Sequence, residues 1–565
     1  MKMTGAQIML DGLVKEGVEI TFGIQGGKVI PLFDTMPQYP QIHHVLTRHE
    51  QGAAHAAEGY ARATGKVGVC IATSGPGATN LVTGIADAFL DSVPMVAITG
   101  QVNRSDIGKD AFQEVDITGI TLPITKHNYL VLDTASLPRI VREAFYLART
   151  GRPGPVLIDV PGDVFMEQVE YHYPKEFDLP SYKPTLKGHP AQIKRAAKLI
   201  NESKEPVILA GRGIIISEAY AELKELAEKA QIPVITTLLG ISAIPESHVL
   251  NYGMLGMHGM AYANLATDAA DTIIAIGMRF DDRATAKISA FNPHARVVHI
   301  DIDPAEIGKN VKVDVPIVGD VKNVLSQLNK LVESNQHVDW IARLDEWRRE
   351  HPALNIRDSE SVLPQYVVRQ IYEVTKGEAT IVTGVGQHQM WAAQHYQYDR
   401  PNSLITSGGL GTMGYGLPAS IGAQMGRPKE TVWCLDGDGS FQMTIQELAT
   451  IQQERLPVKI AIFNNGYLGM VRQWQDLFFG KRYVATPLSG PDFVKVAEAY
   501  GMPGAMVKHR DDVVLAIEQA MKEKGPFLID FRIEPEENVY PMVTLGGSLV
   551  ELLEDEEIKK GVVKS

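Results

Sequence analysis

The chain of 565 residues is too long for one hydrophobic core, and its 45% apolar and 21% charged residues are ordinary for a globular protein of several domains. Its formal net charge of −13 disfavours nucleic acid and anionic membrane as general partners, because both are polyanions. Cys70 and Cys434 each lie in an apolar run, which predicts buried free thiols in a cytoplasmic protein and excludes a disulfide framework.

The first part of the chain predicts a parallel α/β unit that extends to residue 170. Residues 1–20 carry acids and lack a long apolar core, so we expect an amphipathic helix and no export signal. Apolar runs at 67–73 and 94–100 then alternate with a helical pattern at 80–89, as strands and helices of a parallel sheet do. No run reaches the ~20 apolar residues that a membrane span requires.

Two further α/β units are predicted after a linker. Residues 171–190 are rich in proline and charge and have no consistent period, which is typical of a linker. The central unit covers 190–335, and a charged helix with a connector at 336–362 leads to the third unit at 363–545. A charged tail at 546–565 is expected to be mobile or docked. The predicted fold class is therefore α/β with three doubly wound parallel sheets, and the strands expected in the last two units are 206–211, 233–237, 271–277, 296–302, 379–384, 431–437, 459–464 and 526–533.

The strongest chemical signal lies at two strand ends of the third unit. Gly437, Asp438 and Gly439 close one strand, and Asn464 and Asn465 close the next after a helical stretch. A right-handed crossover places both ends at one edge of the sheet, where open α/β sheets bind ligands. A carboxylate and an amide oxygen suit Mg²⁺, and the glycines let backbone N–H groups approach phosphate. A lone GDG is more often an ordinary turn, but this spacing favours a metal site.

Two weaker signals have ordinary alternatives. The stretch from Gly384 to His388 opens a helix with small and polar residues, which suits a phosphate but also an ordinary strand-to-helix turn. Glu50 lies at the junction of a strand and a helix, where a lone glutamate usually interacts with the helix dipole. Neither signal assigns a function without the rest of the chain.

In combination, several motifs resemble the thiamine-diphosphate enzymes, and in detail the catalytic large subunits of the acetohydroxyacid synthase (acetolactate synthase) family. They include Glu50 in RHEQGAAHAAEGYARATG, the GDG and NN pair, and NNGYLGMVRQWQ. The resemblance covers nearly the whole chain, with further matches in TSGPGATN, GRPGPVLIDVP, GMRFDDR, HIDIDPAEIGKN, VGQHQMWAAQ and SGGLGTMGYGLPAS.

This resemblance implies a pyrimidine-binding first domain, a central FAD-binding domain and a third domain that binds the diphosphate through Mg²⁺. It also implies a homodimer or tetramer whose active sites combine Glu50 of one subunit with the metal site of the other, and a regulatory small subunit. The residues carried over are Glu50, Gln113, Lys126 and Trp474 in catalysis; Asp438, Asn465 and Tyr467 at the metal; Gly386, Gln387, His388, Met413, Gly439, Ser440, Leu468, Gly469 and Met470 at thiamine diphosphate; and Arg152, His258, Arg279, Asp301 and Asp320 at FAD.

Some positions need separate weighing. A tryptophan in an apolar stretch is most often core, but by resemblance Trp474 lines the pocket of the acceptor and favours 2-ketobutyrate.

The chain also departs from the family, which commonly has Pro, a small residue, Pro, Lys and Asp at the positions occupied here by Gln25, Lys28, Asn103, Gly162 and Gly384. These departures bear on acceptor preference, rate and herbicide sensitivity.

The predicted function is an acetohydroxyacid synthase of valine, leucine and isoleucine biosynthesis. It would make 2-acetolactate from two pyruvates or 2-aceto-2-hydroxybutyrate from pyruvate and 2-ketobutyrate. The alternative is a flavoenzyme like pyruvate oxidase, against which RFDDR and GMVRQWQ argue. A binding subunit without activity would be expected to have lost Glu50, Asp438 or Asn465, and all three are present.

Overall fold

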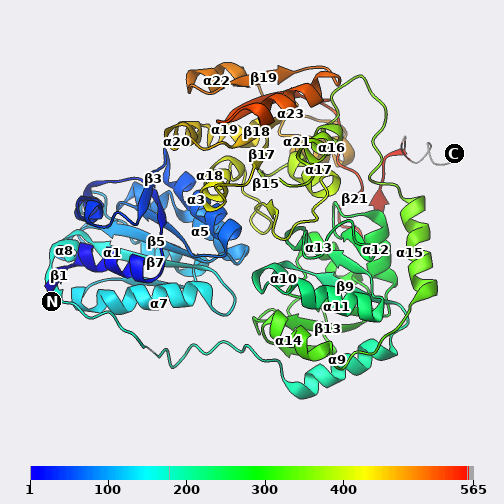
Figure 1. Cartoon of the computed structure of the whole chain (residues 1–565), viewed down its shortest axis with the longest axis horizontal. Helices are drawn as coiled ribbons and strands as arrows, with labels where there is room; N and C mark the ends of the chain where they lie inside the picture. The colour runs from blue at the N-terminus through cyan, green and yellow to red at the C-terminus, as the bar shows by residue number, and fades with distance from the viewer. Residues whose placement is uncertain (1, 177, 557, 559–565) are drawn as a thin grey trace.

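A computed structural model describes residues 2–176, 178–556 and 558. The described chain forms three α/β units, each built on a six-stranded parallel sheet (Figure 1). The first unit is blue to cyan, the central unit is green, and the third is yellow to red. Each sheet has one buried apolar cluster on either face, so all three are doubly wound, as the alternation of strands and helices predicts.

The first sheet has the strand order β3-β2-β4-β5-β7-β6. The order reverses between β2 and β4, so the chain segments after these two strands leave the sheet in opposite directions and open a crevice. Helices α1, α3, α5 and α7 cover its faces. The bounds are β2 Ile20–Gly23, β3 His43–Leu46, β4 Gly68–Ala72, β5 Met95–Gln101, β6 His127–Leu130, β7 Pro155–Pro161, α1 Gly5–Lys15, α3 Glu50–Thr64, α5 Val82–Leu90 and α7 Leu137–Arg149.

The central sheet has the order β11-β10-β9-β12-β13-β14, which is the order of dinucleotide-binding sheets, with the reversal between β9 and β12. Residues 171–190 contain no helix or strand among those described before α9 begins at Pro190, and they run as an extended connection in Figure 1. The bounds are β9 Pro206–Ala210, β10 Val234–Thr236, β11 Asn251–Met254, β12 Thr272–Ile276, β13 Arg296–Asp301, β14 Val315–Val318, α9 Pro190–Glu202, α10 Arg212–Ile216, α11 Tyr220–Ala230, α12 Ala261–Ala269, α14 Val321–Leu328 and α15 Val338–Glu350.

The third sheet, β16-β15-β17-β18-β20-β19, repeats the connection order of the first sheet. Both place the second strand outside the first and reverse direction before the third, a likeness that fits a distant duplication. The bounds are β15 Thr380–Thr383, β16 Leu404–Ile405, β17 Val432–Gly437, β18 Lys459–Asn464, β19 Gly504–Val507, β20 Phe527–Arg532, α16 Pro364–Thr375, α17 Gln387–His395, α18 Gly416–Gly426, α19 Asp438–Gln442, α20 Leu448–Gln453, α21 Gly469–Phe478, α22 Phe493–Ala499 and α23 Asp512–Lys522.

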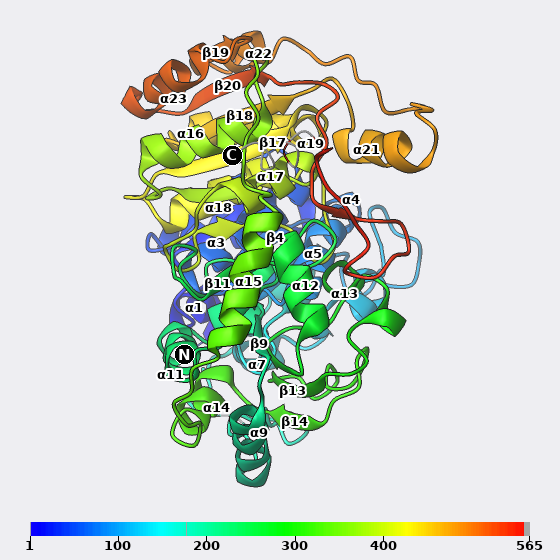
Figure 2. The ribbon, with the colours of Figure 1, turned by 90° about the vertical axis from the view of Figure 1, so that its right-hand side faces the viewer.

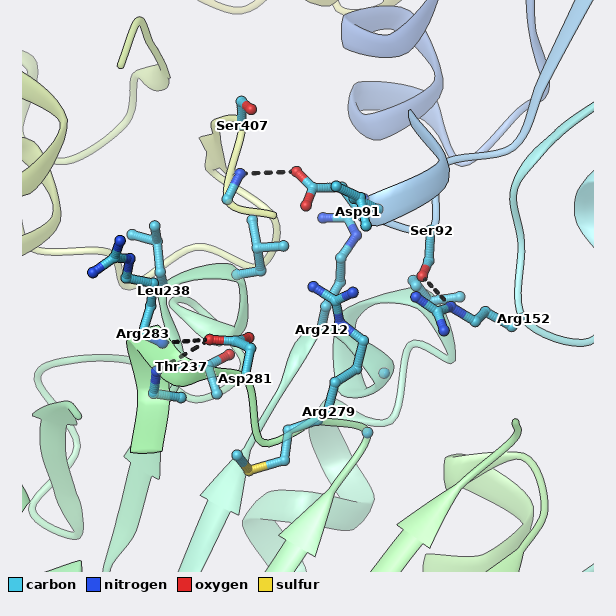
Figure 3. Close-up of a pocket in the computed structure, with 18 of the residues that line it drawn as sticks. Asp91, Ser92, Arg152, Arg212, Thr237, Leu238, Arg279, Asp281, Arg283 and Ser407 are labelled. Atoms are coloured by element: carbon cyan, nitrogen blue, oxygen red, sulfur yellow. Dashed lines mark hydrogen bonds between the residues drawn. The ribbon is translucent and has the colours of Figure 1, made fainter. Parts of the chain in front are cut away.

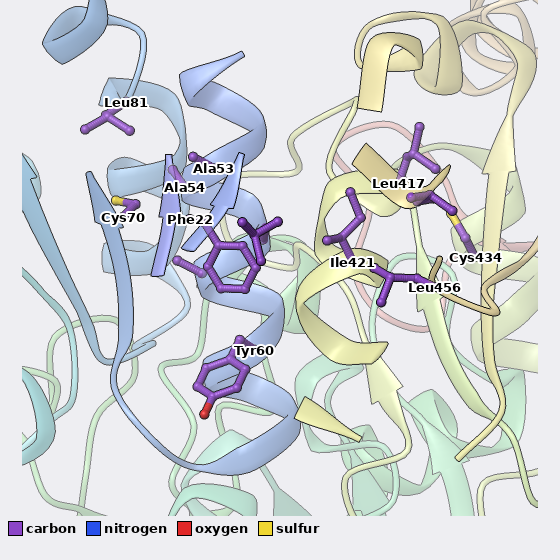
Figure 4. Packing of buried hydrophobic residues seen from close by; sticks show 14 of the residues in the cluster. Phe22, Ala53, Ala54, Tyr60, Cys70, Leu81, Leu417, Ile421, Cys434 and Leu456 are labelled. Atoms are coloured by element: carbon purple, nitrogen blue, oxygen red, sulfur yellow. The ribbon is translucent and has the colours of Figure 1, made fainter. Parts of the chain in front are cut away.

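The first and third units share one apolar core, in which α3 packs on α18 (Figure 4). The backbones of the two helices are in contact at Gly422. A Cβ added to Gly422 would lie 1.8 Å from the carbonyl oxygen of Ala56. Cys70 and Cys434 lie in this core as buried free thiols, as predicted.

The end of the chain runs from the third unit onto the central unit (Figure 2). Its strand β21, Met542–Val543, pairs with β22, Leu552–Leu553, and the N–H of Val543 donates to the carbonyl of Met257. The Glu554 carboxylate lies 2.8 Å from His351 Nδ1. The described part of the predicted tail is therefore docked, and the prediction for 557 and 559–565 lies outside the described residues.

Candidate active site

Asp438 and Asn465 meet at the carboxyl edge of the third sheet. Strands β17 and β18 are parallel neighbours, with Gly437 paired to Phe463, so both strands end at the same level. Asp438 begins α19 and is 2% exposed, and burial raises the pKa of its carboxyl to about 6. A buried carboxylate beside an amide oxygen is a donor set that a hard divalent cation fits.

The turn after β15 faces the same edge. Gly386 has φ +152°, a backbone conformation that side chains rarely adopt, and α17 begins directly after it. His388 is buried, and burial lowers its pKa to about 3, so its ring is a neutral donor or acceptor. Its Nε2 lies 3.4 Å from Asp436 and has no hydrogen-bond partner within the described chain. The sheet order places this turn beside Asp438 at the reversal between β15 and β17.

Apolar side chains cover Gly439. A Cβ added there would lie 2.8 Å from Leu468 Cδ2 and 3.8 Å from Met413 Cε, so glycine lets these side chains approach the backbone. Met413 belongs to a loop that is hydrogen-bonded to Ser440. The N–H of Gly414 in this loop donates to the Ser440 hydroxyl at 2.9 Å. Met413 and Met470 also line the large cavity described below.

Glu50 lies at the carboxyl edge of the first sheet, as the first residue of α3. It is 9% exposed, and its carboxylate accepts a hydrogen bond of 2.9 Å from Asn80 Nδ2. None of its hydrogen bonds or ion pairs within the described chain reaches Asp438 or Asn465. Gln113 lies close by, because a Cβ on Gly75 would be 2.9 Å from its Cβ and a Cβ on Gly77 would be 3.3 Å from Glu50 Oε1.

Lys126 does not join these groups. Its amine donates to the carbonyls of Leu147 and Thr150 at the end of α7 and to the hydroxyl of Tyr182. Burial lowers its pKa to about 7. Lys126 does not line the large cavity, and the contacts it makes here close the end of a helix; its catalytic role stays a prediction.

A cavity of about 780 Å³ opens at the reversal between β9 and β12 (Figure 3), and residues from all three units line it. Its size is that of sites which enclose a cofactor. The five residues assigned to FAD all lie on it: Arg152, His258, Arg279, Asp301 and Asp320. Burial lowers the pKa of His258 to about 4 and raises the pKa of Asp301 to about 6.

Arg212 is a cavity residue that the sequence analysis missed. It begins α10, with one residue between it and the end of β9, and its buried Nε has no hydrogen-bond partner in the part of the chain that the structure describes. Figure 3 shows it between Asp91 and Arg279. A basic residue just after the first strand of a dinucleotide-type sheet was the available signal, since an anionic diphosphate binds at this switch point.

Trp474 is a cavity residue and not part of the core. It is half-buried on α21, lines the cavity together with Met470 and Val471, and has its ring 5.4 Å from that of Phe478. Its position differs from that of an ordinary core tryptophan, and its role in the acceptor pocket stays a prediction.

Comparison with known proteins bears on this arrangement. Residues 3–120 match the N-terminal TPP binding domain of the thiamine pyrophosphate enzymes, residues 193–328 their central domain, and residues 384–531 their C-terminal TPP binding domain. The acetolactate synthase of Mycobacterium bovis is 51% identical over 560 residues, which cover 97% of this chain and 91% of that protein. The chain belongs to the acetolactate synthase family of thiamine pyrophosphate enzymes.

Other members of the acetolactate synthase family show the same extent of similarity. The acetolactate synthase large subunit of Corynebacterium glutamicum is 48% identical over 559 residues, with 97% of this chain and 89% of that protein covered. That of Porphyra purpurea is 48% identical over 563 residues, with 97% and 95% covered. Within the described residues, the helices are all too short or too polar to cross a membrane.

Three of the positions named above as departures, Lys28, Asn103 and Gly162, follow β2, β5 and β7 and lie together. A Cβ on Gly162 would be 3.2 Å from Asn103 Oδ1 and 3.5 Å from Lys28 Cδ, so the Lys28 side chain borders the space that a side chain at 162 would enter. Gly384 is a separate case. A Cβ there would lie 1.9 Å from Asp436 Oδ1, so any side chain at this position requires the Asp436 carboxylate to move.

Proposed function

We propose that this chain decarboxylates pyruvate and transfers the two-carbon unit to a second pyruvate or to 2-ketobutyrate. The observation that carries the proposal is that Asp438 and Asn465 lie side by side at one sheet edge, in a chain 48% to 51% identical to acetolactate synthases. The products would be 2-acetolactate and 2-aceto-2-hydroxybutyrate.

Magnesium and thiamine diphosphate fit the third unit. Asp438 and Asn465 would supply oxygen ligands to the metal, with Tyr467 beside them. The unpartnered Nε2 of His388 and the backbone of the turn at Gly386 are suited to phosphate oxygens. When bound, thiamine diphosphate supplies the electron sink for decarboxylation of a 2-keto acid.

The side chains around this site would control protons and water. Glu50 would hydrogen-bond the aminopyrimidine ring and hold the proton that the ring exchanges. Since none of its contacts reaches the metal pair of its own chain, we propose that a second subunit completes each site. Met413, Leu468 and Met470 would exclude water, so that a second keto acid and not a proton meets the reacting carbon.

FAD fits the central cavity. The central sheet has the strand order of dinucleotide-binding folds, and Arg152, Arg212 and Arg279 would hold the anionic diphosphate. The unpartnered buried nitrogens of Arg212 and His258 are the groups that a ligand would satisfy. We propose that this flavin is structural and carries out no net redox work. The relatives named large subunits further suggest a small regulatory partner for this chain.

A product assay tests the reaction. The purified chain is given pyruvate and 2-ketobutyrate with thiamine diphosphate, Mg²⁺ and FAD, and both hydroxy-keto acid products are resolved. Acetolactate formation with an unchanged flavin spectrum under anaerobic pyruvate supports the synthase. Bleaching of the flavin by pyruvate would instead favour the pyruvate oxidase alternative.

Replacement of Asp438 by alanine tests the metal site. The variant should lose Mg²⁺-dependent binding of thiamine diphosphate, followed by fluorescence, because the metal loses a charged ligand. Asp511→Ala is the matched control, since Asp511 is exposed in the same unit and its side chain makes no cap hydrogen bond. Equal cofactor affinity in the two variants would contradict the assignment.

A further inference from the structure

Gln473 is a fully buried polar residue on α21 that the proposed mechanism leaves without a role. Its Oε1 accepts from the N–H of Val539 at 2.8 Å, and its Nε2 donates to the carbonyl of Val539 at 3.0 Å. A backbone N–H can only donate and a carbonyl can only accept, so these two bonds fix which end of the carboxamide is oxygen.

The fixed oxygen of Gln473 orients Gln387. Gln387 Nε2 donates to Gln473 Oε1 at 2.8 Å and to the carbonyl of Glu537 at 2.9 Å. Its own oxygen must therefore point the other way, and it accepts from Asn465 Nδ2 at 3.2 Å. Both polar ends of the Gln387 side chain are thus engaged inside the protein.

The hydrogen bond from Asn465 to Gln387 fixes the orientation of the Asn465 carboxamide. Because its amide nitrogen donates to Gln387, its oxygen lies on the opposite side, where it accepts from the N–H of Tyr467 at 3.0 Å. A carbonyl oxygen has two lone pairs, so Oδ1 keeps one for a cation. An amide turned the other way would present its nitrogen, which cannot bind Mg²⁺.

Gly469 makes this chain of amides possible. A Cβ at that position would lie 2.2 Å from Gln387 Oε1 and 2.7 Å from Asn465 Nδ2. A side chain there would push the two amides apart. Glycine at 469 therefore leaves the space in which the two amides meet.

We propose that Gln473 is a positioning residue for the metal site: through Gln387 it holds Asn465 with its oxygen toward the cation. The inference rests on the proposed function, in which Asn465 is a magnesium ligand. It also couples helix α21, which carries Trp474, and residues 537–539 to the metal through side-chain amides. A partner bonded directly to a metal ligand, as Gln387 is to Asn465, typically changes the affinity of the metal by about 10- to 100-fold when it is removed, and Gln473 acts through that partner.

The test measures Mn²⁺ as a magnetic probe for the magnesium position, in the presence of thiamine diphosphate, on the full chain. Gln473→Met removes the oxygen that orients Gln387 and should weaken Mn²⁺ binding by about 10-fold, the lower end of that range, because Gln473 acts through Gln387. FAD affinity should stay as in the wild type. Gln475→Met is the matched control, because Gln475 lies on the same helix and, within the described chain, its side chain bonds the carbonyl of Val484 and the hydroxyl of Thr486 and not the amides near the metal.

Gly469→Ala breaks the same link from the other side and leaves the bonds of Gln473 to Val539 in place. It should reproduce the loss of Mn²⁺ affinity. If Gln473→Met also lowers the melting temperature, Gly469→Ala shows whether the loss of affinity comes from the broken link or from the loss of stability. Mn²⁺ binding in Gly469→Ala as tight as in Gln475→Met would overturn the positioning role while leaving the proposed function intact. A wild-type chain without cofactor-dependent Mn²⁺ binding would overturn the proposed function itself.

Discussion

At the scale of single residues, the structural contact of Glu50 can be tested apart from its proposed role in proton transfer. Its carboxylate accepts a hydrogen bond from Asn80. A glutamine has an oxygen that can accept the same bond, so the helix start need not change.

Glu50→Gln should therefore keep the melting temperature and the affinity for thiamine diphosphate but slow exchange of the cofactor's C2 proton by orders of magnitude. The reason is that the amide cannot take up the proton that a carboxylate takes. Proton exchange is followed by magnetic resonance. Exchange at the wild-type rate in the variant would show that Glu50 does not have this role.

Trp474 offers a second test at this scale. One methylene in an apolar pocket is worth ~1 to 3 kcal/mol, or roughly 10- to 200-fold in discrimination. Trp474→Leu should lower the preference for 2-ketobutyrate over pyruvate within that range and leave acetolactate formation largely intact. Since Trp474 is half-buried, the melting temperature should fall only slightly.

Phe478→Leu is the control for Trp474. Phe478 contacts the indole ring on the same helix but does not line the cavity. The product ratio with mixed acceptors is measured for both variants. If the two variants shift the ratio equally, Trp474 acts only through packing of α21.

At the scale of elements, the contact between α3 and α18 joins the two units that carry the candidate thiamine site. Alanine at position 422 would place its Cβ 1.8 Å from the Ala56 carbonyl oxygen, far inside contact distance. The helices must then separate, and overpacking of a core costs about 1 to 3 kcal/mol or more.

Gly422→Ala should therefore lower the melting temperature by several degrees, measured by calorimetry. Gly525→Ala is the control, because a Cβ there would meet its nearest atom only at 3.8 Å. An unchanged melting temperature in Gly422→Ala would mean that the two helices have room to separate.

At the scale of the whole molecule, Glu246 joins the central unit to the third. Its carboxylate accepts from the N–H of Tyr398 at 2.8 Å, and burial raises its pKa to about 8, helped by the nearby charge of Asp399. The folded protein therefore holds a proton on this group at a pH where the unfolded chain has lost it. Its stabilising contribution is complete below the ordinary pKa of 4.5 and is lost as the pH rises through about 8.

The melting temperature of the wild type should accordingly fall between about pH 5 and about pH 8 by more than that of Glu246→Gln. Glutamine keeps an acceptor for Tyr398 but does not ionise. Glu518→Gln, on the partly exposed face of α23, is the control. Parallel pH profiles for wild type and Glu246→Gln would exclude this source of pH dependence.

The sequence by itself determined the features that depend on neighbours along the chain. The strand ending in GDG and the strand ending in Asn-Asn could be predicted because apolar runs and glycines mark where strands stop, and the right-handed crossover then places Asp438 beside Asn465. Buried thiols at Cys70 and Cys434 followed from the same runs.

Only the tertiary structure decided which side chains are engaged with one another across units. Arg212 lines the large cavity, Lys126 bonds the carbonyls at the end of α7, and the Gln387 side chain is bonded to Gln473 and Asn465. These outcomes depend on hydrogen-bond partners far apart in the chain, which periodicity and spacing do not encode. The physical reason is that a buried polar group takes the partner that the packing of whole units brings within bonding distance.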